Sequence, residues 1–99
     1  MIDPVRASLE AVVDEASFVT FLNALAQDWD AEQELERVRP SAPHGPGAHG
    51  WENGTIGTFL ECAAAWAEAS AQRLPPGYEL PKNPWRRCAD IIFMGKIYE

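Results

Sequence analysis

The sequence is poor in histidine, cysteine and basic residues, and it contains no long apolar run. Its 99 residues include two His, two Cys and eight Lys plus Arg against 15 Asp plus Glu, for a formal net charge of −7. This charge repels phosphate backbones and anionic lipid, so we expect neither a nucleic-acid partner nor a membrane partner. No stretch reaches the roughly 18 apolar residues that a bilayer-spanning helix needs, and residues 1–4 do not resemble a secretory signal, which predicts a cytoplasmic protein.

The few potential metal ligands do not form a recognisable site. Cys62 and Cys88 are separated by 25 residues and make no CxxC pair, so we expect two free, partly buried thiols. His44 and His49 offer only two ligands in a Pro- and Gly-rich segment, whereas a structural zinc needs four. We therefore expect no metal and no cofactor.

Two further motifs for ligand chemistry are incomplete. The acidic run at 28–36, considered as a calcium loop, has Gln33 and Arg39 where Gly and Glu are required. The glycines of segment 54–57 lack the spacing and the lysine of a phosphate-binding loop. No nucleophile-bearing turn such as GxSxG is present either, so the sequence predicts a protein that is not an enzyme.

What the sequence does contain is apolar residues at helical spacing. We predict an all-α fold in which three to four helices surround one aromatic-rich core, as a single domain over residues 1–99. Two stripes carry most of the evidence and should face the core: Phe18, Phe21, Leu22, Leu25 and Trp29, then Ile56, Phe59, Leu60, Ala63, Trp66 and Ala67. Trp66 and Trp85 are expected in that core, and Trp51 could lie inside or outside.

Capping residues mark where the helices begin. Asp3 with Pro4 starts a short first helix, and Asp14 can cap a second, although one continuous helix remains open. Asn53 or Thr55 caps a third helix that runs to about Arg73. Asn83 followed by a proline starts a fourth. The segment 40–50, with three Pro and three Gly, is predicted to be the long loop between the second and third helices.

The negative charge is concentrated in the first third of the chain. Residues 1–36 carry nine acids and one base, whereas residues 37–99 carry six acids and seven bases. Carboxylates at i,i+4 within 28–36 repel each other, so this part of the helix should fray unless cations approach. Arg86 and Arg87, in a basic cluster with Lys82, are predicted to supply those cations.

Three segments resemble a family of short bacterial proteins catalogued as a domain of unknown function. The resemblance is carried by WENGTIGTFLECAAAWAE, NPWRRCADIIFMGKIYE and SFVTFLNALAQDW, and it covers nearly the whole chain. It implies a compact helical fold and no established activity. We also expect Tyr98 to pack against the core, with Trp51, Asn53 and the C-terminus close together.

The sequence is compatible with two classes of function. The first is a small acidic protein-binding module for a partner that could be basic, similar in size and charge to immunity proteins that neutralise toxins. Its predicted partner-binding residues are Asp28, Trp29, Asp30, Glu32, Glu34 and Trp51. The alternative is a small-ligand-binding or enzymatic cleft, formed by Trp51, Trp66, Trp85, Arg86 and Arg87.

Overall fold

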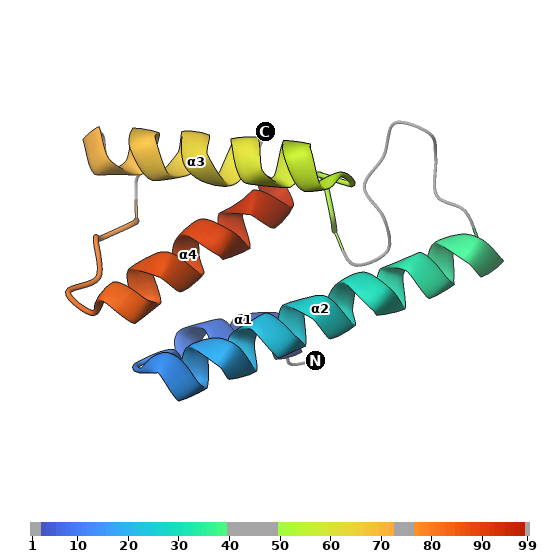
Figure 1. Cartoon of the computed structure of the whole chain (residues 1–99), viewed down its shortest axis with the longest axis horizontal. Coiled ribbons are helices and arrows are strands. Elements are labelled where there is room, and N and C mark those ends of the chain that lie inside the picture. The colour runs from blue at the N-terminus through green and yellow to red at the C-terminus, as the bar shows by residue number, and fades with distance from the viewer. Residues whose placement is uncertain (1–2, 40–49, 73–76, 99) are drawn as a thin grey trace.

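The structure, a computed structural model, describes residues 3–39, 50–72 and 77–98 (Figure 1). Within these residues it contains four α-helices and no β-strand. They are α1 (Pro4–Glu10), α2 (Glu15–Val38), α3 (Ile56–Gln72) and α4 (Pro84–Ile97). The predicted all-α fold is therefore confirmed. Segment 40–49, with His44 and His49, lies outside the described residues, as does the predicted helix end at Arg73.

The first two helices are separate, and their own side chains define the break. Asp3 accepts hydrogen bonds from the backbone N–H of Val5 at 3.0 Å and of Arg6 at 3.5 Å, with Pro4 in the first turn. Asp14 accepts from the Ser17 N–H at 2.8 Å, and the Ser17 hydroxyl is 3.0 Å from the Asp14 N–H, which completes a capping box. The chain therefore turns between α1 and α2 instead of continuing as one helix.

The other two helices also begin at predicted caps. The hydroxyl oxygen of Thr55 accepts from the Thr58 N–H at 3.1 Å, which makes Thr55 rather than Asn53 the cap of α3. At the start of α4, Asn83 Oδ1 accepts from the Trp85 N–H at 2.9 Å. The Asn83 amide also donates to the Val13 carbonyl at 2.8 Å, so this cap ties α4 to the turn before α2.

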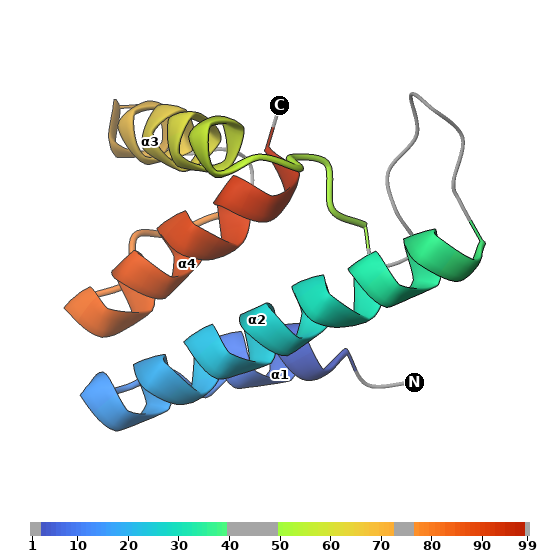
Figure 2. The ribbon, with the colours of Figure 1, turned by 45° about the vertical axis from the view of Figure 1, so that its right-hand side comes forward.

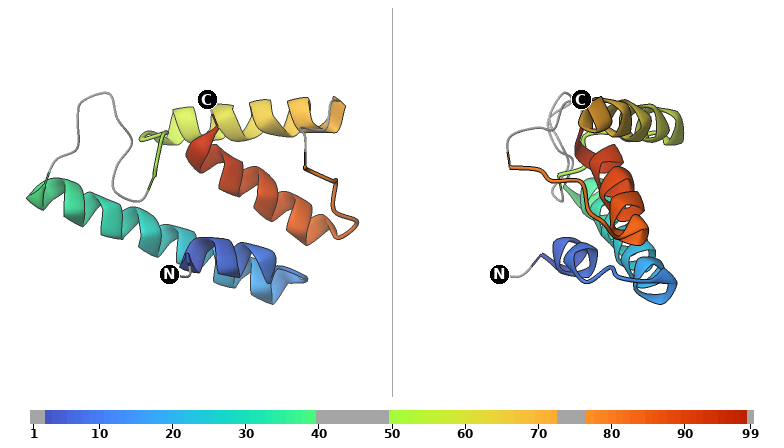
Figure 3. Two further views of the ribbon diagram at one scale, coloured as in Figure 1. Left: turned by 180° about the vertical axis from the view of Figure 1, so that it is seen from behind. Right: turned by 90° about the vertical axis from the view of Figure 1, so that its left-hand side faces the viewer.

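Helix α4 lies at the centre of the fold. It packs against α1, α2 and α3, whereas the described backbones of α2 and α3 do not approach each other. Figure 1 shows α3 and α2 on opposite sides of α4, and the rotated view in Figure 2 keeps them apart. In the right panel of Figure 3, α1 lies beside α2 and α4 on one side. The bundle is thus a central helix with neighbours on three sides.

The hydrophobic core lies where α1, α2 and α4 meet. Its buried members are Val5, Leu9, Val12, Phe21, Leu25, Ala89 and Phe93. Helix α3 adds buried Ala63 and Trp66, so the expectation for Trp66 is confirmed. Trp85 is 36% exposed, so its predicted place in the core is wrong; it packs at the edge, against the Phe18 ring.

Both predicted stripes are only partly buried. Leu22 is 37% exposed, and Ile56 and Leu60 are 81% and 59% exposed, so the expectation that each whole stripe faces the core is wrong at these positions. The reason is the arrangement of the helices. Because α3 packs on α4 alone, only the part of its stripe that faces α4 is buried.

The longest apolar stretches of the described helices are still too short or too polar for a bilayer. None of these helices could cross a membrane.

Candidate functional site

A buried ion pair joins the C-terminal end of α4 to the middle of α2. Lys96 Nζ lies 2.8 Å from Asp28 Oδ2, and the two side chains are only 7% and 11% exposed. The indole N–H of Trp51 donates to the same Asp28 oxygen at 2.8 Å, and the Lys96 ammonium lies 5.4 Å from the centre of the Trp51 ring. Trp51 is therefore held by both members of the pair. Its backbone N–H donates to the carboxylate of buried Glu32 at 3.2 Å.

Residues 52 and 53 cap the end of α4. The last carbonyls of a helix have no partner within it. Here the Glu52 N–H donates to the Lys96 carbonyl at 3.0 Å, and the buried Asn53 amide donates to the carbonyls of Gly95 at 2.8 Å and Tyr98 at 3.0 Å. The expected proximity of Trp51, Asn53 and the C-terminal residues is confirmed.

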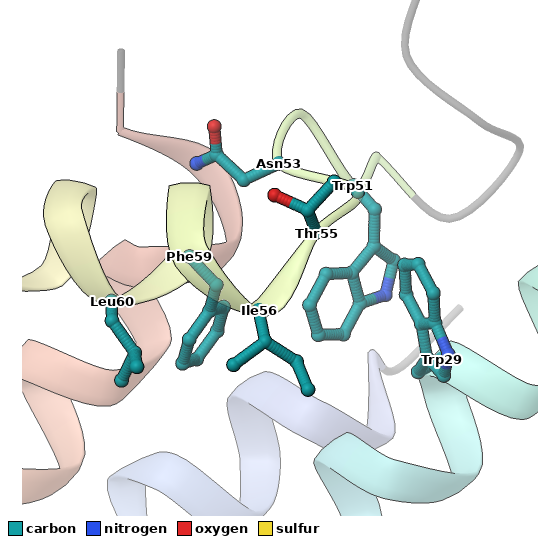
Figure 4. Close-up of a pocket in the computed structure, with 8 residues that line it drawn as sticks. Trp29, Trp51, Asn53, Thr55, Ile56, Phe59 and Leu60 are labelled. Carbon is teal, nitrogen blue, oxygen red and sulfur yellow. The ribbon is translucent and has the colours of Figure 1, made fainter.

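Trp51, fixed in this way, forms one wall of an apolar pocket. Its ring makes an edge contact with Trp29 at 5.0 Å between centroids and stacks on Phe59 at 6.1 Å. The pocket, with a volume of about 580 Å³, is lined by Trp29, Trp51, Asn53, Gly54, Thr55, Ile56, Phe59 and Leu60. Figure 4 shows the side chains of Ile56, Phe59 and Leu60 extending from the first turns of α3, with the two indoles beside them. None of the lining side chains is ionisable.

The walls of this pocket come from acidic segments. Residues 15–36, which form most of α2, contain no Lys or Arg, and neither do residues 50–72, which contain α3. Exposed acids on these helices include Asp30, Glu34 and Glu61. The pocket is thus an apolar surface in a negative field, a combination that attracts cations with apolar neighbours.

A second polar cluster lies near the start of α4, and its residues do not line the pocket. Arg87 donates to the buried Ser70 hydroxyl at 2.9 Å and to the Ala67 carbonyl at 3.0 Å. Its guanidinium also lies 5.1 Å from the centre of the Trp66 ring. These contacts join α3 to α4.

Tyr78 completes this cluster. Its hydroxyl donates to Asp90 at 2.9 Å and accepts from Arg87 at 3.2 Å, and its ring contacts Trp66. Burial raises the pKa of Tyr78, and the Asp90 carboxylate also raises it, while the bond from Arg87 lowers it.

The prediction that Arg86 and Arg87 form ion pairs with the acidic residues of segment 28–36 is wrong, because the structure shows other partners for both arginines. Arg86 Nε instead lies 2.9 Å from Asp90 of its own helix. The reason is the register of the helices. The first turn of α4 lies beside Phe18, and ten residues of helix, about 15 Å, separate Phe18 from Asp28. Lys96, in the last turn of α4, is the cation that reaches Asp28.

The structure divides the six predicted partner-binding residues into three groups. Asp28 and Glu32 point into the molecule and hold Trp51. Trp29 and Trp51 are half-buried and lie together in the pocket wall. Asp30 and Glu34 are exposed on α2, where Glu34 forms an ion pair with Arg37. The acidic helix does not fray: α2 continues to Val38.

The predicted alternative cleft is not assembled as a unit. Trp85 lies at the start of α4 against Phe18, whereas Trp51 lies at the other end of that helix beside Lys96. Arg86 and Arg87 are engaged with Asp90 and Ser70, and neither lines the pocket.

Three residues of this site, Ile56, Leu60 and Lys96, are absent from the predicted site residues; Ile56 and Leu60 were expected in the core. The sequence offered one signal for Lys96. This lysine lies between Gly95 and Ile97 in a helix that otherwise packs on its neighbours, so it is placed to form an ion pair inside the fold.

The described residues contain no group of three His, Cys, Asp or Glu side chains that could hold a metal ion. Both cysteines are free, as predicted. Cys62 is half-buried with its sulfur 3.5 Å from Asn53 Oδ1, whereas Cys88 is exposed, contrary to the expectation of partial burial.

The fold and the pocket define a small all-α protein with an apolar site bordered by acidic helices. The chain belongs to a family of unknown function, DUF7660, whose model matches residues 14–99. The match begins at the residue that caps α2, so α1 precedes it. No curated protein and no solved structure matches the chain.

Proposed function

We propose that this protein is a binding module that receives a partner protein in the pocket beside Trp29 and Trp51. The observation that carries the proposal is the exposure of Ile56 and Leu60, 81% and 59%, next to two half-buried indoles. Large apolar side chains that gather on one exposed surface are typical of interaction sites, and aromatic residues are frequent anchors there.

The charge of the surrounding helices favours a basic partner. Residues 15–36 and 50–72 lack Lys and Arg, so a partner with cationic side chains around an apolar centre gains Coulomb attraction on approach. The same field disfavours a second copy of the chain, because two acidic surfaces would meet. Neutralisation of a basic toxin is one form that such binding could take, an analogy of size and charge alone.

The pocket supports binding rather than catalysis. Acid and base chemistry needs a titratable group in reach of the bound molecule. The lining side chains carry none, and the charged pair that contacts Trp51, Asp28 with Lys96, is engaged in holding its indole. We also propose a cytoplasmic location, which the two free cysteines support.

A display experiment tests the proposal. A library of random peptides is selected on the full chain, and binding of the recovered peptides is measured by fluorescence anisotropy. We expect peptides that combine Leu, Phe or Trp with Lys or Arg. The neutral substitution Leu60→Ser should weaken their binding about tenfold, the loss expected for part of a buried leucine. Leu60 is mainly exposed, so the variant should keep its circular dichroism spectrum.

Ala65→Ser is the matched control, because Ala65 is exposed on α3 and lies five residues from Leu60, on a different side of the helix. Its binding should stay within about twofold of the parent. Recovered peptides that bind the Leu60→Ser variant as tightly as the parent would refute the proposal, as would a selection that enriches nothing.

The pocket volume favours one second candidate, a small apolar ligand. About 580 Å³ lies within the range of roughly 300–1,000 Å³ that is usual for small-molecule sites. An apolar compound that binds with high affinity and displaces every selected peptide would support this function.

A further inference from the structure

The pocket lies at one end of a longer set of exposed and half-buried apolar side chains, which we call the channel, and helix periodicity indicates which residues belong to it. On α3, Trp66 contacts Tyr78 on one side of the α3–α4 contact. Ile56, Leu60 and Ala67, spaced i, i+4 and i+11, lie on the other side. They form a row along α3 that begins at the pocket.

Helix α4 contributes the floor of the channel. Ala89 and Phe93 face the core with α1 and α2, Gly95 faces Phe59 of α3, and Asp90 faces Tyr78. The remaining side of α4 carries Trp85, Cys88 and Ile92, spaced i, i+3 and i+7, which places them in one row. Trp85 and Cys88 are exposed, and Ile92 is half-buried.

Helix α2 contributes the second wall. Phe18, Leu22 and Trp29, at i, i+4 and i+11, share one side of this helix. Phe18 contacts Trp85 at 5.5 Å between ring centres, and Trp29 contacts Trp51 at 5.0 Å. Leu22, which is 37% exposed, lies between these two contacts. The α2 row therefore runs from the start of α4 to the pocket.

The channel and α1 lie on different sides of α4. Helix α1 packs where α2 meets α4, and Arg6 lies over the Phe93 ring at 5.1 Å. In the right panel of Figure 3, α1 is to one side of α2 and α4, and no described helix covers the other side between α2 and α3. On this side the side chains of Leu22, Leu60 and Trp85 are exposed, so a partner can reach them.

We infer that the channel binds an amphipathic, cationic α-helix of a partner protein, laid along α4 between α2 and α3. This inference rests on the proposed function and specifies its ligand. A helix fits better than a strand, because the channel presents rows of side chains and no free backbone edge. From Trp85 to Lys96 a helix rises by about 16 Å, so about three turns of the partner are covered.

The acidic residues beside the channel favour cationic residues on the polar face of the partner helix. Exposed acids flank the channel on the outer sides of both walls, with Glu15 and Asp30 on α2 and Glu61 and Glu68 on α3. Long Lys and Arg side chains can keep their stems on apolar surface while their charges reach such carboxylates. The bound helix thus presents Leu or aromatic residues to the channel and Lys or Arg to its flanks.

The exposed thiol of Cys88 allows a direct test in the full chain carrying Cys62→Ala. The probe is a capped peptide of about 18 residues with Leu at i, i+3, i+4 and i+7 and Lys between them. Its binding should slow the alkylation of Cys88 by iodoacetamide about tenfold at saturation. A peptide of about seven residues, long enough only for the pocket, should leave the alkylation rate unchanged. So should a scrambled peptide of the same composition.

Leu22→Ser supplies a second readout. It should weaken the long peptide about tenfold and leave the short peptide unaffected, whereas Asn23→Ser, at the adjacent exposed position, should change neither. If the long peptide loses affinity with Leu60→Ser but does not protect Cys88, the helix inference fails and the pocket proposal stands. If no peptide responds to Leu60→Ser, both fail. A higher protein concentration without peptide should leave the alkylation rate of Cys88 unchanged. If it slows the alkylation instead, a second copy of the chain occupies the channel and the inference is overturned.

Discussion

At the scale of single residues, Lys96 determines the geometry of the pocket. It is 6% exposed, pairs with Asp28 and lies over the ring of Trp51. Burying two charges is expensive, and breaking one partner leaves the other charge uncompensated in a poorly hydrated place. The pair therefore fixes which way the Trp51 indole points more than it adds net stability.

Replacing Lys96 by Met should show this cost. Lys96→Met keeps most of the apolar stem and removes the charge, so Asp28 loses its buried cation. We expect the free energy of unfolding to fall by about 3–5 kcal/mol. Urea unfolding followed by circular dichroism measures it. Lys82→Met, at an exposed lysine, should change the same quantity by less than about 0.5 kcal/mol, and an equal effect of both variants would contradict this role.

Tyr78 gives the fold a dependence on alkaline pH. Its pKa is raised in the folded protein, chiefly by burial, so the unfolded chain releases this proton at lower pH than the folded one. The contribution is complete below the usual tyrosine pKa of 10.0 and is lost as pH rises above it. We expect the free energy of unfolding from urea titrations to decline as pH rises above about 10. Tyr78→Phe should lower stability at pH 7 and make this decline shallower; an unchanged decline would refute the assignment.

At the scale of helices, α3 approaches α4 closely at Gly95. A methyl group at this position would lie 3.0 Å from the Phe59 carbonyl oxygen and 3.1 Å from its ring. Glycine is usually a cost in a helix. Here it lets Phe59 sit directly on α4, and Phe59 in turn supports the stacked Trp51.

Alanine substitutions at two helical glycines should therefore have opposite signs. Gly95→Ala gains helix propensity but forces α3 away, and we expect a net loss of about 1–3 kcal/mol in unfolding free energy. Gly57→Ala, in α3 with nothing within 4 Å of the added carbon, should instead stabilise by about 0.5 kcal/mol. Thermal unfolding of the two variants side by side measures the difference. A stabilised Gly95→Ala variant would show that the two helices can separate without cost.

At the scale of the whole molecule, the central position of α4 explains both the stability and the proposed site. A helix with neighbours on three sides buries one continuous core, and it keeps α2 and α3 far enough apart to leave apolar side chains uncovered. Helix α1 supplies Val5, Leu9 and Val12 to that core although it lies before the part matched by the family model. A partner helix in the channel would cover α4 on its remaining side.

The sequence by itself determined the helices of the described residues. Their starts at Asp3, Asp14 and Asn83 depend on hydrogen bonds between a side chain and the next two or three backbone N–H groups, which lie close in the sequence, although the sequence left open whether the first two helices are continuous. Even the closeness of Trp51, Asn53 and the C-terminal residues could be anticipated. Local chemistry thus predicted the fold class and where the helices begin.

Only the tertiary structure decided which apolar and charged residues are covered. A stripe such as Ile56 to Ala67 shows that one side of a helix is apolar, but its neighbours decide how much of that side is buried. Likewise, the sequence does not distinguish Asp28 from Asp30. Asp28 is largely buried because Lys96 and Trp51, from distant segments, contact its carboxylate. Burial and pairing depend on contacts between residues far apart in the chain, and spacing along one helix does not contain that information.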